Sequence, residues 1–249
     1  MNGHGSFGEQ LSRLLENRNQ RVPDLSRLAG IPDNDLQAVV DGDNPDPALL
    51  RRLAPALRFH AADLFVLAGM RVPDDLAPLD EAAGALVPWL VRAAIGLSPE
   101  GKLDLLDFVK SLPRSPRVHS VSPPKRYEQY PPGFGGTLVR LLANRNLNWE
   151  SSVRILLLVT EGRVYLSAAT IGQVGRGQIA ISSDLFSGIA AILGIPADDL
   201  AILGGVNLRT GEPPAQSVAA YVAALVWEVR SLTAEQIRQA QGLADSMKI

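Results

Sequence analysis

The side chains that most often carry catalysis or bind metals are scarce and scattered in this sequence. None of the 249 residues is a cysteine, which excludes disulfide scaffolds, thiolate metal sites and cysteine nucleophiles. The three histidines, His4, His60 and His119, lie too far apart for a zinc-binding spacing or an obvious catalytic triad. We therefore expect no catalytic residue, no metal and no cofactor, and no enzyme.

One segment has the spacing of a phosphate-binding loop. Gly96 and Gly101-Lys102 match the glycine and lysine positions of such a loop. Leu103, however, stands where a Mg²⁺-binding hydroxyl is needed, and no strand signal precedes the segment. Ser98 followed by an acidic first turn is instead typical of a helix N-cap, and we interpret the segment in that way.

Composition and charge limit the classes of protein further. Twenty-four basic residues stand against 26 acidic ones, and this near-balance excludes a protein that coats nucleic acid by charge alone. The longest apolar stretches, 82–91 and 218–227, are well short of the roughly 20 residues that a membrane span needs. The first ten residues do not have the pattern of a secretory signal. We expect a soluble cytoplasmic protein with no membrane partner, and the few lysines suggest a GC-rich bacterial source.

The chain contains an internal repeat. Residues 7–19 (FGEQLSRLLENRN) and 134–146 (FGGTLVRLLANRN) are identical at nine of 13 positions, at an offset of 127. Residues 61–69 and 197–205 are identical at five of nine positions, at an offset of 136. The sequence therefore predicts two copies, 1–112 and 134–249, with about nine extra residues between the two anchors in the second copy.

The segment between the copies, residues 113–133, contains six prolines and shows no helical or strand period. Such a segment favours an extended, semi-rigid spacer. Its charged residues are four basic side chains and one acidic one: Arg114, Arg117, Lys125, Arg126 and Glu128. We expect a solvated linker, with a phosphate-contacting arm as the alternative.

Apolar residues follow a helical period, and sustained strand-like alternation is missing. In the first copy Leu11, Leu14 and Leu15 share one helix face, and glycines at 30 and 42 can close two later helices. Four more helices are expected: from Pro23 to Gly30, from Pro32 or Asp33 to Gly42, and at 46–57 and 61–68. A helical pair should end each copy, at about 80–112 and 214–247. The class is all-α.

Five short helices in this order, with glycines closing the second and third, resemble the lambda-repressor/Cro-like (XRE family) helix-turn-helix domain. In the first copy the resemblance rests on residues 25–42 (LSRLAGIPDNDLQAVVDG) and the leucines that follow. In the second copy it rests on residues 165–177 (YLSAATIGQVGRG). It covers about 60–70 residues of each copy and leaves the terminal helical pairs outside. The resemblance implies two tandem helix-turn-helix domains, each with a C-terminal helical extension.

In that family the start of the third helix lies in the major groove of double-stranded DNA while flanking groups hold phosphates. For the second copy the resemblance implies base contacts from Ser167, Ala168, Thr170 and Gln173. It also implies a phosphate or guanine contact from Arg176. Residues 134–180 carry five arginines, Arg140 and Arg145 among them, against two glutamates, which suits a polyanion. The alternative is that Thr170, Ile171 and Val174 only pack the domain.

The first copy departs from this pattern. Its corresponding helix carries aspartates and no basic residue, so Asn34 and Gln37 could contact bases only if other groups offset that charge. The basic candidates for that role are Arg13, Arg18, Arg21 and Arg27. The stronger expectation for this copy is that it binds a protein partner or serves only as a scaffold.

We therefore expect a nucleoid-associated, DNA-binding transcriptional regulator whose second repeat makes the main contact. The alternative is a protein-interaction adaptor or anti-repressor that kept the fold without DNA binding. The two copies could act as a pseudo-dimer within one chain. The terminal helices at 80–112 and 214–247 could pair copies within one chain or between chains of a homodimer, or each extension could cover only its own copy. The residues considered for such a buried contact are Trp89, Leu90, Phe108, Val109, Tyr221, Leu225 and Trp227.

Overall fold

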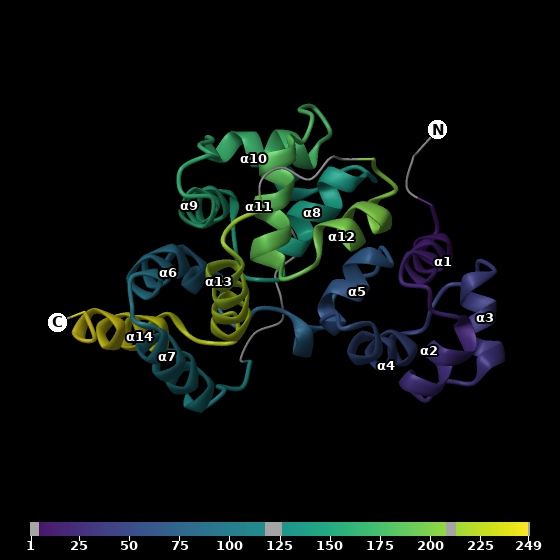
Figure 1. Ribbon diagram of the computed structural model, residues 1–249, viewed down its shortest axis with the longest axis horizontal. Coiled ribbons are helices and arrows are strands. Elements are labelled where there is room, and N and C mark those ends of the chain that lie inside the picture. The colour runs from purple at the N-terminus through teal and green to yellow at the C-terminus, as the bar shows by residue number, and fades with distance from the viewer. Residues whose placement is uncertain (1–4, 118–125, 208–212, 249) are drawn as a thin grey trace.

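The computed structural model describes residues 5–117, 126–207 and 213–248, and these residues form helices and connecting loops with no strand. The all-α class is therefore confirmed. Each copy contributes seven α-helices in the same order (Figure 1). The first copy contains α1 (Phe7–Asn17), α2 (Val22–Ala29), α3 (Asp33–Val40), α4 (Pro47–Leu57), α5 (Ala61–Leu67), α6 (Val87–Ile95) and α7 (Pro99–Ser111).

The second copy repeats this order from Phe134 onward. Its helices are α8 (Phe134–Ala143), α9 (Trp149–Val159), α10 (Ala168–Gly175), α11 (Ser183–Leu193), α12 (Ala197–Gly204), α13 (Gln216–Val229) and α14 (Ala234–Ser246). Among the described residues, three short 3₁₀ helices lie between the longer elements: η1 (Asp74–Leu76), η2 (Glu81–Ala85) and η3 (Arg126–Glu128). The five helices expected between residues 7 and 68 are present, with ends that differ by a residue or two.

Side-chain caps begin several of these helices. Ser6 and Glu9 form a reciprocal capping box at the start of α1. The hydroxyl of Ser98 accepts a hydrogen bond from the backbone N–H of Gly101 (3.1 Å) at the start of α7. Thr233 caps α14 in the corresponding position of the second copy. The segment around Gly96 and Lys102 is therefore a helix start, as interpreted from the sequence.

The extra residues of the second copy lie around its second helix. Helix α9 has 11 residues where α2 has eight. The connection to the third helix then takes residues 160–167 in the second copy, against residues 30–32 in the first. The third helix of the second copy is therefore held on a longer loop than its counterpart.

A glycine at the second position of the repeat allows the first and third helices to touch. A Cβ atom added at Gly8 would lie 2.0 Å from the carbonyl oxygen of Val39, and one added at Gly135 would lie 2.0 Å from that of Val174. Both contacts are with backbone, which cannot move aside without shifting a helix. Close helix packing therefore explains why Phe-Gly opens both copies.

The helical extensions of the two copies pack on each other. Helices α6 and α7 contact α13 and α14, and this bundle lies at the lower left of Figure 1. Of the residues considered for a buried contact, Leu90, Val109 and Leu225 are fully buried, whereas Trp89 remains 45% exposed. The extensions thus join the copies within one chain rather than covering each copy separately.

No single helix among the described residues is long and apolar enough to cross a membrane. Helices α11 and α12 satisfy the length and composition criteria only together, across a bend of 107°. Both helices contribute many residues to the buried core, which accounts for their apolar character.

We predict that Gly8→Ala and Gly135→Ala each lower the free energy of unfolding by about 2 kcal/mol or more, because the added methyl overlaps a backbone carbonyl. The matched control is Gly242→Ala in α14, where a Cβ would meet nothing within 4 Å. That substitution should instead raise stability by about 0.5–1 kcal/mol, since alanine favours a helix interior. Urea denaturation measures all three. Equal effects of the three substitutions would contradict the close-packing explanation.

Candidate functional site

Helix α10 is the third helix of the second copy, and its first turn is open to solvent. Ser167, which precedes the helix, is exposed, while Ala168, Thr170 and Gln173 are half-buried. Ile171 and Val174 are buried, so these two residues pack the domain. The hydroxyls of Ser167 and Thr170 lie 3.0 Å apart and share a hydrogen bond. Side chains of small size therefore surround an accessible helix N-terminus.

Arg176 follows α10 and rests on an aromatic ring. Its guanidinium carbon lies 5.6 Å from the ring centroid of Trp149, and its Nε donates to Oε1 of Gln178 (3.3 Å). The same indole packs so closely beneath α10 that a Cβ at Gly172 would lie 2.6 Å from it. Trp149 thus supports both the helix and the arginine.

Trp149 is in turn held by the segment that leads into α8. Its Nε1–H donates to the hydroxyl of Tyr130 (2.7 Å), and the Nη2 of Arg140 donates to the Tyr130 carbonyl (2.9 Å). Burial raises the pKa of the Tyr130 hydroxyl, so this group stays neutral at physiological pH. Arg140 is half-buried. In this arrangement Arg140 positions the support of Arg176 rather than standing free at the surface.

Arg145 was expected among the DNA contacts, and the structure corrects this expectation. Its side chain has no exposed surface and forms two hydrogen bonds with Asp63, from Nη1 to Oδ1 (2.8 Å) and from Nη2 to Oδ2 (2.9 Å). Further donors reach the carbonyls of Leu141 and Leu193. A side chain enclosed in this way cannot reach a phosphate. Its partner lies 82 residues away in the sequence, so the pairing has no local signal.

Arg18 occupies the corresponding position of the first copy and makes the corresponding contact. Its Nη2 lies 2.7 Å from Oδ2 of Asp199, and its Nη1 donates to the carbonyl of Leu57 (2.9 Å). Its side chain is 24% exposed. Most of its donors are therefore used within the protein, and it is poorly placed to offset the charge of α3.

The two arginine contacts are related by an approximate twofold symmetry. Arg18 of the first copy pairs with Asp199 of the second, and Arg145 of the second pairs with Asp63 of the first. The preceding asparagine of each copy also donates to the same carboxylate. Helix α1 accordingly packs on α12 and α5 on α8. The repeats meet as the halves of a self-complementary dimer do.

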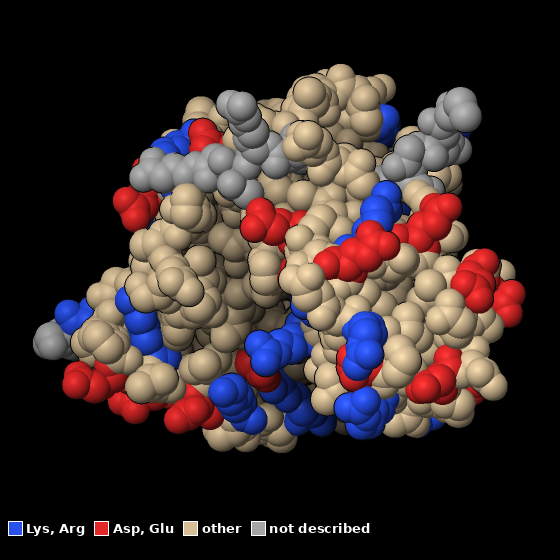
Figure 2. Space-filling model, turned by 45° about the vertical axis from the view of Figure 1, so that its right-hand side comes forward, with Lys and Arg blue, Asp and Glu red and all other residues tan. Residues whose placement is uncertain are grey.

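The candidate DNA contacts of the first copy lie on an acidic surface. Asn34 and Gln37 are exposed on α3, and Gln37 donates to Asp41 (2.9 Å). Arg21, 80% exposed, is paired with Asp24. Figure 2 shows acidic side chains along the right-hand edge of the molecule, where the first copy comes forward, and basic ones along its lower side.

Two arginines of the linker contact the rest of the protein, although residues 113–116 and Arg126 are exposed. Arg114 forms an ion pair with Glu228 (2.8 Å), and Arg117 donates to the backbone carbonyls of residues Asp74 and Ala77. Both arginines are therefore engaged, which disfavours the phosphate-contacting arm. Lys125 lies outside the described residues.

Sequence reasoning missed two functional elements of this site. The first is the pair of acidic partners, Asp63 and Asp199, although both lie in the second repeated segment. The second is Trp149, which carries Arg176. The repeated Asn-Arg-Asn and the shared aspartate are among the polar residues that the two copies have in common, but nothing in the sequence pairs them across the copies.

Comparison with known proteins adds no further constraint. No family model, no curated protein and no solved structure matches the chain.

We predict that Arg145→Met lowers the free energy of unfolding by about 3–5 kcal/mol, because it leaves the Asp63 carboxylate buried without its cation. Arg18→Met should lower the free energy of unfolding by clearly less, since the contact of Arg18 with Asp199 is partly open to solvent. Asp63→Leu combined with Arg145→Met should be less unstable than Arg145→Met alone. Urea denaturation of the three variants gives the comparison, and equal losses for Arg18 and Arg145 would contradict the role of burial.

We predict that stability falls as the pH drops from about 6.5 to 4, in part because of His60. Burial lowers the pKa of this imidazole to about 4; Asp63 opposes the shift, while Arg145 and Arg230 add to it. Its ring stacks on Trp227 with 3.4 Å between centroids. The unfolded chain binds a proton at His60 first in this range, so protonation favours unfolding.

The His60→Asn variant isolates this contribution. The stability difference between wild type and variant, measured by urea denaturation at pH 7.0 and pH 4.5, should be smaller at pH 4.5. A difference that does not change with pH would show that His60 titrates normally in the folded protein.

Proposed function

We propose that the protein binds double-stranded DNA through α10 and its surroundings and acts as a transcriptional regulator of the helix-turn-helix type. The observation that carries the proposal is a difference in charge between the corresponding helices. Residues 162–183 contain no carboxylate and include Arg163 and Arg176, whereas residues 33–46 contain five aspartates and no basic residue. Of the two third-helix segments, only that of the second copy therefore has a charge that a phosphate backbone would attract.

The local shape supports the same proposal. The first turn of α10 carries Ala168, Ala169 and Thr170, and short side chains let a helix end approach base edges closely. The helix N-terminus adds a partial positive charge that favours nearby phosphates. Gln173, one turn along the helix, has an amide that can bond both N6 and N7 of adenine.

The supports beneath α10 favour a fixed geometry. Arg176 lies on Trp149, which is hydrogen-bonded to Tyr130. A cation held on a ring loses less side-chain freedom when it binds than one on a free stem. We assign Arg176 a phosphate contact and Gln173 a base contact on this basis.

Each chain then contributes one third helix that is flanked by arginines and free of carboxylates. Figure 1 shows α3 at the right and α10 at the upper left, on different sides of the molecule. An operator with two half-sites would therefore need α10 from two chains, and we include such a homodimer on DNA in the proposal.

The test is a gel shift with genomic DNA fragments at low and moderate salt. Arg176→Ala should weaken binding to all fragments by about tenfold or less, and it should reduce the slope of log affinity against log salt by about 1. Arg176→Lys should restore most of the lost affinity. Gln173→Ala should cost about 1–3 kcal/mol of discrimination at one base position.

The matched control is Arg238→Ala, which removes the same charge from an exposed site on α14. It should leave binding unchanged. The proposal fails if no fragment shifts at micromolar protein and low salt, or if Arg238→Ala and Arg176→Ala weaken binding equally.

A second candidate function is favoured by the acidic α3 of the first copy. Its exposed aspartates would repel a duplex but suit a basic protein surface. On this alternative the chain is an adaptor or anti-repressor that binds protein and not DNA.

A further inference from the structure

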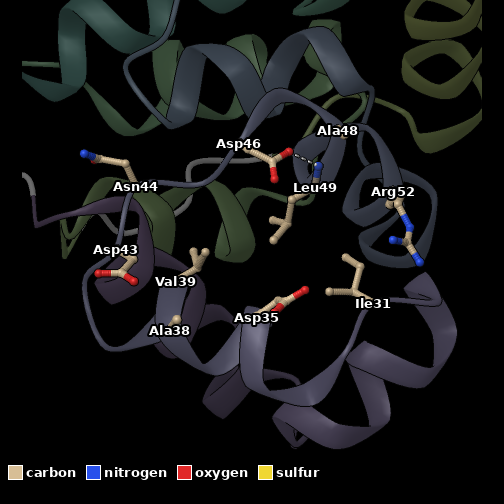
Figure 3. Close-up of a pocket in the computed structure, with 10 residues that line it drawn as sticks. All are labelled: Ile31, Asp35, Ala38, Val39, Asp43, Asn44, Asp46, Ala48, Leu49 and Arg52. Carbon is tan, nitrogen blue, oxygen red and sulfur yellow. Dashed lines mark hydrogen bonds between the residues drawn. The ribbon is translucent and has the colours of Figure 1, made fainter.

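A cavity of about 220 Å³ opens between α3 and the start of α4 in the first copy (Figure 3). Its wall on one side is α3 with Asp35, and on the other the first turn of α4 with Asp46. One carboxylate oxygen of Asp46, Oδ1, accepts a hydrogen bond from the backbone N–H of Leu49 (2.8 Å) and so caps α4. In Figure 3 the carboxylates of Asp35 and Asp46 point toward the space between the two helices.

The floor of the cavity is apolar. Ile31, Val39 and Leu49 are buried, and their side chains line the space between the two acidic walls. A ligand that fits must therefore present an aliphatic portion to the floor and a cationic portion to the walls.

The charge of the lining is unbalanced. The lining contains three carboxylates, those of Asp35, Asp43 and Asp46, and one guanidinium, that of Arg52. Within the described part of the chain the side chains of Asp35 and Asp43 form no hydrogen bond or ion pair. Arg52 lies to one side, against Gly30, where a Cβ would be 3.2 Å from its Nη2. The cavity thus keeps acceptors available for an incoming cation.

We propose that this cavity binds an arginine side chain of a protein partner. The three methylene groups of arginine would cover Ile31, Val39 and Leu49, and its planar guanidinium would reach the carboxylates of Asp35 and Asp46. The site belongs to the first copy alone, because Thr170 stands in α10 where Asp35 stands in α3. The proposal does not depend on DNA binding by α10.

The experiment is an NMR titration of the ¹⁵N-labelled full chain with the peptide acetyl-Gly-Arg-Gly-amide. We expect saturable shifts of amides between residues 31 and 52, with a Kd on the order of 1 mM for so small a probe. The same peptide with citrulline, which has the same shape and no charge, should bind at least fivefold more weakly. Spermidine, a free cation without a guanidinium, should also bind at least fivefold more weakly.

Matched variants separate the cavity from the general charge of the surface. Asp35→Asn should weaken binding of the arginine peptide at least fivefold, while Asp33→Asn, two residues earlier in α3 and outside the lining, should change this binding less than twofold. Arg52→Gln should tighten binding at least twofold, a gain that a folding defect would not produce.

Several results would overturn the proposal. These are shifts that do not saturate or that lie elsewhere, equal weakening by Asp33→Asn and Asp35→Asn, and equal binding of the citrulline peptide. Equal or tighter binding of spermidine would assign the site to a free polyamine instead of a partner protein. Loss of DNA binding would leave all these readouts unchanged.

Discussion

The arrangement of the two copies depends on one buried ion pair and its twofold counterpart. Arg145 and Asp63 are both excluded from solvent, and neither charge would be tolerated in that position without the other. The guanidinium also satisfies two carbonyls at helix ends, so it links α5 of one copy to α8 and α11 of the other. The counterpart pair, Arg18 and Asp199, repeats this contact at a more open position. Together the pairs fix the register of α1 on α12 and of α5 on α8.

The contact between the two copies explains why parts of their sequences are so similar. The most similar segments of the copies, 7–19 and 134–146, supply the close-packing glycines, the core leucines and the paired arginines. Of those roles only the glycine contact involves the third helices, and it is made with their backbone carbonyls, whereas the side chains of the third helices differ strongly between the copies. Identity between the copies therefore reports how they pack, whereas the divergence between α3 and α10 is where a difference in binding is expected. An acidic cavity on one copy and a basic helix end on the other are consistent with two different partners.

Helix positions could be predicted from the sequence because they follow local patterns: the leucine spacing of α1, the glycines after α2 and α3, and the hydroxyl caps of α7 and α14. The role of Arg145 could not be predicted from the sequence. An arginine in a basic stretch looks like a phosphate contact until its carboxylate partner, 82 residues away, is known. The support of Arg176 by Trp149 was missed for the same reason, since a ring beneath a helix in the next element leaves no periodic signal. The docking of Arg114 and Arg117 depends likewise on residues distant in the chain.

The self-complementary contact also has a consequence for how the protein can diversify. Two separate chains that met in this way would dissociate on dilution, and every substitution in one would appear in its mate. Joined through residues 113–133, the halves stay together at any concentration, because their association is intramolecular. Each half can then change its outward surface alone. The two outward surfaces can therefore become different, which is impossible in a homodimer of identical chains, provided that the contact between the copies is preserved.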